Sequence, residues 1–201
     1  MPASRRNLLA LGVLSYLSRQ PMHPYELGRT LKANGDARSI RYTHGSLYMV
    51  VQQLAERGLI EAQERSRAGQ RPERTTYAIT EAGRAELHAW LGELVADPRH
   101  EYPQFVTALS LIGALHPDEV VVLLRTRLER LHATHAEVRT LIDETVAGGV
   151  HPLFLVEEDY RLALLDAEIA FVERFIARIT DPATGWGPLW AQFHDSEDHP
   201  T

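Results

Sequence analysis

Residues 43–60, THGSLYMVVQQLAERGLI, decide how this chain folds. Thr43 is a favourable N-cap and Gly58 is a typical C-terminal stop, so the stretch predicts a helix between them. The apolar positions recur at helical spacing and predict one inward stripe: Leu47, Val51 and Leu54. The helix therefore has one face for a core and another face that points elsewhere.

The outward side chains of this helix are short or carry amides, unlike the Glu and Lys of a merely solvated helix. They are Thr43, His44, Ser46, Met49, Gln52 and Gln53. Amides and hydroxyls can read base edges in a major groove, so this face predicts contact with duplex DNA. Tyr48 has two interpretations of equal weight, core filling or a phosphate contact through its hydroxyl.

Two more helices are expected before Thr43. Residues 5–19 are apolar over most of a helical circumference, and Pro21 ends that helix. Pro24 suits the first turn of the next helix, and Gly35 marks its end. The inward residues of this second helix are predicted to be Tyr25, Leu27 and Leu31.

A basic hairpin is expected next. Residues 59–66 and 75–80, LIEAQERS and TTYAIT, are short strand-like runs around the turn RAGQRPER at 67–74. Its arginines would neutralise phosphates: Arg65, Arg67, Arg71 and Arg74. Three helices followed by such a hairpin are typical of a winged helix-turn-helix, in which one helix enters the major groove and the wing reaches the flanking backbone. A soluble surface loop is the alternative for the hairpin taken alone.

Charge is distributed unevenly along the 201 residues, whose net charge is -6. Residues 1–90 hold 13 Lys and Arg against 8 Asp and Glu, whereas residues 91–201 hold 8 against 19. A positive front and an acidic back suit a protein of which only one part meets phosphate. The asymmetry alone would also fit ordinary variation in surface charge.

The composition also restricts chemistry and location. The absence of cysteine excludes disulfides and thiol nucleophiles, and it fits a cytoplasmic protein. We interpret the apolar run near the N-terminus as a core helix rather than a signal peptide. We expect no membrane span, because no stretch reaches the roughly 18 to 20 apolar residues that one requires.

Three runs together closely resemble the PadR family of bacterial transcriptional regulators. They are LLALGVLSYLSRQPMHPYELGRTL, THGSLYMVVQQLAERGLIEAQ and RTTYAITEAGRAEL. The most specific pieces are Met22-His23-x-Tyr25-Glu26-Leu27, Gly45-Ser46-Leu47-Tyr48, Gly58-Leu59-Ile60 and Tyr77-x-Ile79-Thr80-x-x-Gly83. The resemblance is strong over about residues 5–90, and the remainder resembles the longer C-terminal domain of one branch.

The resemblance implies that residues 44–57 are the recognition helix, that Tyr48 lies beside the DNA backbone, and that the wing spans residues 65–74. It also implies dimerisation through the C-terminal helices. Two positions depart from the family pattern. Pro24 stands where Gly is usual, and Met49, which often is Pro in the family, alters the reading face.

The back half is expected to be helical. Thr80 caps a fourth helix to about Val95, and a further helix covers about residues 103–115. A long helix after Pro117 has apolar steps of three and four, which predict a coiled-coil seam: Val121, Leu124, Leu128, Leu131, His135, Val138 and Ile142. A second long helix follows Gly148 and Gly149 with the same spacing: Leu162, Leu165, Ile169, Val172 and Ile176.

These stripes are too broad for one mutual contact, so we predict that they dimerise with a second copy of the chain. An intramolecular bundle is the alternative. The overall prediction is a mainly α protein. It has a winged helix-turn-helix domain with a small hairpin wing at 1–90, a helical dimerisation and effector domain at 91–182, and a tail at 183–201.

Catalysis and metal binding are not expected. The chain has no glycine-rich phosphate loop, nucleophile elbow or His-Glu-x-x-His motif, so we predict no enzyme and no cofactor. Glu129, His132 and His135 lie on one helix, but a metal site requires three or four convergent ligands. We therefore interpret the two histidines as structural and predict no metal.

A small aromatic effector is a further hypothesis, because the family includes ligand-released repressors as well as members without a known ligand. Candidate pocket residues are Trp90, Tyr102, Phe105, Trp186 and Trp190. Core or interface packing is the alternative for these aromatics. The leading prediction is a homodimeric repressor at an inverted repeat of double-stranded DNA. The alternative is a protein interaction module that keeps the winged helix as a scaffold.

Overall fold

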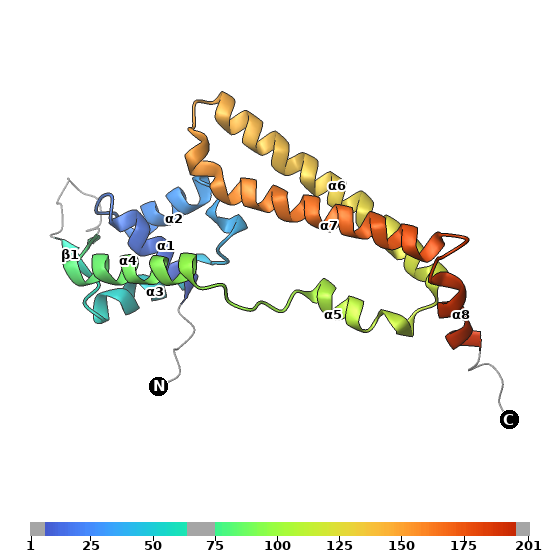
Figure 1. Ribbon diagram of the computed structural model, residues 1–201. Helices are drawn as coiled ribbons and strands as arrows, with labels where there is room; N and C mark the ends of the chain where they lie inside the picture. The colour runs from blue at the N-terminus through green and yellow to red at the C-terminus, as the bar shows by residue number, and fades with distance from the viewer. Residues whose placement is uncertain (1–6, 64–74, 196–201) are drawn as a thin grey trace. The chain divides into compact units, whose positions relative to one another are not determined.

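The computed structural model describes residues 7–63 and 75–195, and it divides between His100 and Glu101 into two compact units. Figure 1 shows the helices and strands of both. Each unit has its own apolar core. Within the described ranges, no helix is both long and apolar enough to cross a bilayer.

The N-terminal unit begins with the three expected helices. They are α1 (Leu8–Leu17), α2 (Pro24–Ala33) and α3 (His44–Glu56), with a 3-10 turn η1 (Asp36–Arg38) before α3. The Asn7 side chain accepts from the Leu9 amide, so α1 begins later than the predicted residue 5. Leu27 and Leu31 are buried as predicted, but the prediction for Tyr25 was wrong. Its side chain lies at the first turn of α2 and is 48% exposed.

The expected hairpin follows α3. Strands β1 (Ile60–Gln63) and β2 (Thr76–Ile79) pair antiparallel, with Ile60 opposite Ile79. Met22, just before α2, exchanges two backbone hydrogen bonds with Tyr77 of β2, at 3.0 and 2.9 Å. The hairpin base is therefore joined to the helices by main-chain bonds.

Two glycines shape the chain between the end of α3 and the start of the fourth helix, α4 (Glu81–Ala96). Gly58, after α3, has a φ of 68°, in the left-handed region that side chains disfavour. At Gly83, a Cβ would collide with the backbone oxygen of Leu59, so only glycine lets α4 begin this close to β1. These contacts give physical reasons for two of the glycines that carry the family resemblance.

In the C-terminal unit, the regular secondary structure of described residues 101–195 is all helical. Its elements are α5 (Gln104–Ser110), η2 (Ile112–Ala114), α6 (Pro117–Ala147), η3 (Pro152–Leu155), α7 (Val156–Thr180) and α8 (Gly187–Asp195). The helix expected at 103–115 is divided at Leu111, where the backbone leaves helical geometry. The region predicted as a tail contains α8, in which Trp190 packs against the core of this unit.

Helices α6 and α7 lie side by side within the chain (Figure 1). Five of the predicted seam residues are buried in the single chain: Val121, Leu124, Val138, Leu162 and Val172. The others are half-buried: Leu128, Leu131, His135, Ile142, Leu165, Ile169 and Ile176. The alternative left open by the sequence, an intramolecular pair, therefore accounts for much of the two seams. Their contact with a second chain stays a prediction.

Polar groups also join the two long helices. His135, at a seam position, has its Nε2 3.0 Å from Asp166 Oδ1 on α7. Arg127 donates from Nε to Glu168 at 2.6 Å, and its guanidinium lies 3.5 Å from the centre of the Phe105 ring. These contacts give His135 a structural partner and connect α5 to both long helices.

Candidate functional site

The exposed face of α3 is the first candidate site, and its N-terminus is tightly capped. Thr43 Oγ1 accepts from the Ser46 amide at 3.1 Å, and Ser46 Oγ accepts from the Thr43 amide at 2.8 Å. Ser46 Oγ also lies 2.9 Å from the Thr43 carbonyl, to which it donates. The hydroxyls predicted to select bases are therefore engaged in holding the first turn of the helix.

Two aromatic rings lie along one side of this face. The rings of His44 and Tyr48 are stacked, with centroids 4.8 Å apart and planes 19° apart. Tyr48 is 38% exposed and lies outside the core cluster of the unit. Of its two interpretations, core filling is the one that this geometry does not support.

The second half of the face carries three long side chains. Gln52 donates from Nε2 to Glu56 Oε1 at 3.2 Å. Met49 is 55% exposed, and Gln53 is exposed as well. Within the described ranges, neither has a hydrogen-bond or ring partner.

The four wing arginines, Arg65, Arg67, Arg71 and Arg74, lie outside the described residues. The base of the hairpin is well placed beside α3, however. Thr80 Oγ1 donates to the Gly58 carbonyl at 2.8 Å and accepts from the Gly83 amide at 3.1 Å. One side chain thus connects the end of α3, the end of β2 and the start of α4.

Sequence reasoning missed Arg41, two residues before the cap of α3. It is exposed and has no carboxylate partner among the described residues. The preceding segment is anchored, because the Tyr16 hydroxyl donates to Asp36 and accepts from Asn34 Nδ2 at 2.8 Å. Burial, followed by the bond to Asp36, raises the pKa of the Tyr16 phenol. A charge pattern could have revealed Arg41, since it directly precedes the polar-faced helix.

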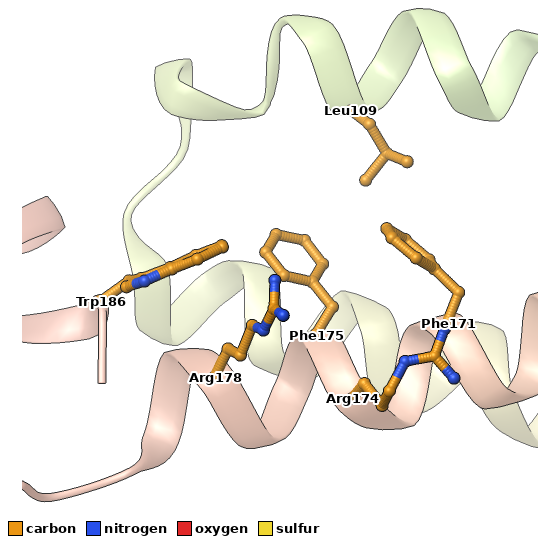
Figure 2. A pocket seen from close by; sticks show the side chains of 6 residues that line it. All are labelled: Leu109, Phe171, Arg174, Phe175, Arg178 and Trp186. Carbon is orange, nitrogen blue, oxygen red and sulfur yellow. The ribbon is translucent and has the colours of Figure 1, made fainter. Parts of the chain in front are cut away.

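A second candidate site is a cavity of about 320 Å³ within the C-terminal unit. Figure 2 shows its lining side chains: Leu109, Phe171, Arg174, Phe175, Arg178 and Trp186. The rings of Phe175 and Trp186 are 6.3 Å apart, and the Arg178 guanidinium lies 5.2 Å from the centre of the Trp186 ring. Within the described chain, neither arginine has a carboxylate partner.

Of the five aromatic residues predicted for an effector pocket, Trp90 belongs to the N-terminal unit and the other four belong to the C-terminal unit. Trp90 is buried in the N-terminal core, whereas Tyr102 is 87% exposed. Phe105 and Trp190 pack against the core of the C-terminal unit, and only Trp186 lines the cavity. The phenylalanines and arginines of α7 were missed as pocket residues, because the spacing of apolar residues in that helix predicts a packing seam and carries no signal for a cavity.

No cluster of three or more His, Asp or Glu side chains suited to a metal occurs in the part of the chain that the structure describes. Glu129 and His132 are both exposed. His135 is paired with Asp166 instead.

The N-terminal unit has the architecture of a winged helix-turn-helix, with three helices followed by a two-stranded hairpin. Residues 13–89 match the model of the transcriptional regulator PadR-like family. The N-terminal unit therefore matches this family of transcriptional regulators, as its sequence motifs predicted.

Solved structures of similar fold extend over most of the chain. Bacillus subtilis PadR in complex with operator DNA is 19% identical, with a TM-score of 0.67 over 87% of this chain and 98% of that chain. The same protein in complex with p-coumaric acid is 17% identical, with a TM-score of 0.68 over 87% of this chain and 96% of that chain. The PadR-like transcriptional regulator BC1756 from Bacillus cereus is 17% identical, with a TM-score of 0.57 over 84% of this chain and 95% of that chain. No curated protein sequence matches the chain.

Proposed function

We propose that this regulator binds operator DNA as a homodimer, with α3 in the major groove and the hairpin wing along the flanking backbone. The observation that carries the proposal is the exposed, polar and aromatic face of α3, which is capped at Thr43 and joined to the base of the hairpin by Thr80. A helix presented beside a basic hairpin is the docking arrangement of winged helices. The operator complex of B. subtilis PadR supports the same interpretation.

Phosphate contacts would come from cations near this face. Arg41 precedes α3, and the hairpin carries four arginines in its sequence. Such contacts release counterions, so each steepens the fall of affinity with salt by about 0.9 in the slope of a log-log plot. They would position α3 on the duplex without selecting its sequence.

A second copy of the chain would contact an exposed apolar line on α7. Val156, Tyr160 and Leu164 recur every four residues there and are 57%, 65% and 53% exposed. Exposed apolar lines of this kind mark interfaces. Two recognition helices held at fixed spacing fit an inverted repeat with half-sites about one helical turn apart. A dimer bound to an inverted repeat in a promoter would exclude RNA polymerase and so repress transcription.

The test is a gel shift of the full-length chain with the DNA upstream of its own coding sequence, over a series of salt concentrations. We expect binding at low salt that weakens steeply as salt rises. Arg67→Ala with Arg71→Ala should weaken binding to every sequence, whereas Arg130→Ala, on the exposed side of α6, should not. Failure to bind any duplex at very low salt would leave the alternative, a protein interaction module.

A second function is response to a small aromatic effector, favoured by the cavity of Figure 2. Its volume suits a ligand of one or two rings, and Phe171, Phe175 and Trp186 provide faces for stacking. Arg174 and Arg178 would pair with a carboxylate, so the site favours an aromatic acid over a planar cation. The p-coumaric acid complex of B. subtilis PadR supports an effector of this class.

Titration with p-coumarate, followed by tryptophan emission, tests this second function. We expect quenching that is reduced in Arg174→Ala and in Trp186→Phe but retained in Arg139→Ala, which lies on α6 away from the cavity lining. A planar cation of equal size should have a smaller effect. Equal quenching by the acid and the cation, or equal affinity in all variants, would contradict the assignment.

A further inference from the structure

The structure leaves few side chains of α3 free to read bases. The Thr43 and Ser46 hydroxyls bond to each other's backbone amides, and the Gln52 amide is held by Glu56. The Ser46 hydroxyl both accepts and donates, so it would have to give up an existing bond before it could bind a base, whereas Thr43 and Gln52 keep unused donors but are oriented by the bonds that they make. The rings of His44 and Tyr48 are stacked on each other, so Met49 and Gln53 are the members of the predicted reading face that have neither a hydrogen-bond nor a ring partner in the described residues.

The two free side chains lie on one line of the helix. Gly45, Met49 and Gln53 are four residues apart, so they follow one another along the same face of α3. A Cβ at Gly45 would meet nothing within 4 Å, and the surface there is open. A groove can therefore approach the helix backbone closely at Gly45, with the Met49 side chain one turn further along.

Met49 is the apolar member of this line. Its thioether is 55% exposed, and its neighbours along the line are a glycine and an amide rather than further apolar groups. A protein partner would be expected to meet a continuous apolar patch instead of one isolated side chain. In a major groove, the apolar feature of matching size is the 5-methyl group of thymine.

We propose that Met49 recognises the methyl group of an operator thymine in each half-site, while Gln53 donates to and accepts from a neighbouring base. The proposal rests on the proposed DNA-binding function and deepens it. Burial of one methyl group against the thioether excludes water from both, which favours thymine over cytosine and over uracil at that position. Gln53 can pair with adenine through both atoms of its amide.

The test begins with an operator selected from random duplexes by the full-length protein. Each thymine in a half-site is then replaced in turn by uracil, which removes only the methyl group and keeps the base pair. We expect one position at which uracil weakens binding by about fourfold per half-site, the loss corresponding to one buried methyl group. At the same position, Met49→Ala should bind thymine and uracil equally, whereas Met49→Leu should keep a preference for thymine.

Gln53→Ala is the matched control, because it lies on the same line but should retain the uracil effect. Met49 is exposed, so its variants should unfold at the wild-type temperature, which circular dichroism verifies. Equal sensitivity of the wild type and Met49→Ala to uracil would overturn the proposal, as would the absence of any sensitive thymine. Failure to select any operator would instead contradict the proposed function, so the two failures are distinguishable.

Discussion

The two units of this molecule bury their apolar side chains in different ways. In the N-terminal unit, the helices and hairpin enclose one core, in which Leu14 and Leu47 are 0% and 1% exposed. In the C-terminal unit, α6 and α7 bury Val172 fully but leave Tyr160 and Leu164 of α7 exposed. The first unit buries most of its own apolar residues and leaves a few exposed, such as Leu91 and Val95 on α4, whereas the second retains more apolar surface that a partner can cover.

The largest effect expected from this comparison is a loss of stability when a side chain in the core of the N-terminal unit is shortened. Leu14→Ala should lower the free energy of unfolding by about 2 to 5 kcal/mol, because the deleted side chain is fully buried. Leu164→Ala should change it by less than about 0.5 kcal/mol in dilute protein, because that side chain is exposed. Urea unfolding measures both. Equal losses would mean that the two units do not differ as described.

The next prediction concerns the exposed apolar surface of α7 and its role in self-association. Tyr160→Ser with Leu164→Ser should weaken self-association by about thirtyfold or more, since both apolar side chains would leave the proposed interface. Analytical ultracentrifugation over a concentration series measures the change. Glu173→Gln, at an exposed polar position of the same helix, is the control. An unchanged dimer in the double variant would place the interface elsewhere.

A smaller effect is expected from a single cation of the N-terminal unit. Arg41→Ala should reduce DNA affinity and lower the slope of the salt dependence by about 0.9, because one phosphate contact is lost. The reduction should be similar for all duplex sequences. Fluorescence anisotropy at several salt concentrations measures it. A loss confined to one sequence would show that Arg41 reads bases instead.

The smallest effect is expected at Gly45, where one substitution should change DNA affinity without lowering the stability of the fold. Gly45→Ala should leave unfolding unchanged or raise its free energy by up to about 0.5 to 1 kcal/mol, since the added Cβ meets nothing and alanine favours helix. DNA affinity should nevertheless fall several-fold, because the methyl group would separate α3 from the groove. Wild-type affinity in this variant would mean that the groove does not approach the backbone there.

Local signals in the sequence predicted much of the N-terminal unit. The cap at Thr43, the stop at Gly58 and the stripe of Leu47, Val51 and Leu54 were all confirmed. They are predictable because a cap bond spans three residues and helical periodicity is a property of the segment itself. The inward position predicted for Tyr25 was wrong, because it does not depend on such local signals alone. The orientation of a first-turn side chain depends on which elements pack around it.

By itself, the sequence determined most of the helices, the cap of α3 and the family resemblance of the N-terminal unit, since these depend on neighbouring residues and on periodic patterns. Only the tertiary structure decided that the long-helix seams meet within one chain and that Phe171, Arg174 and Trp186 surround a cavity. It also decided which polar groups of α3 remain free. Such outcomes depend on contacts between residues far apart in the chain and on side-chain directions, and spacing alone contains neither.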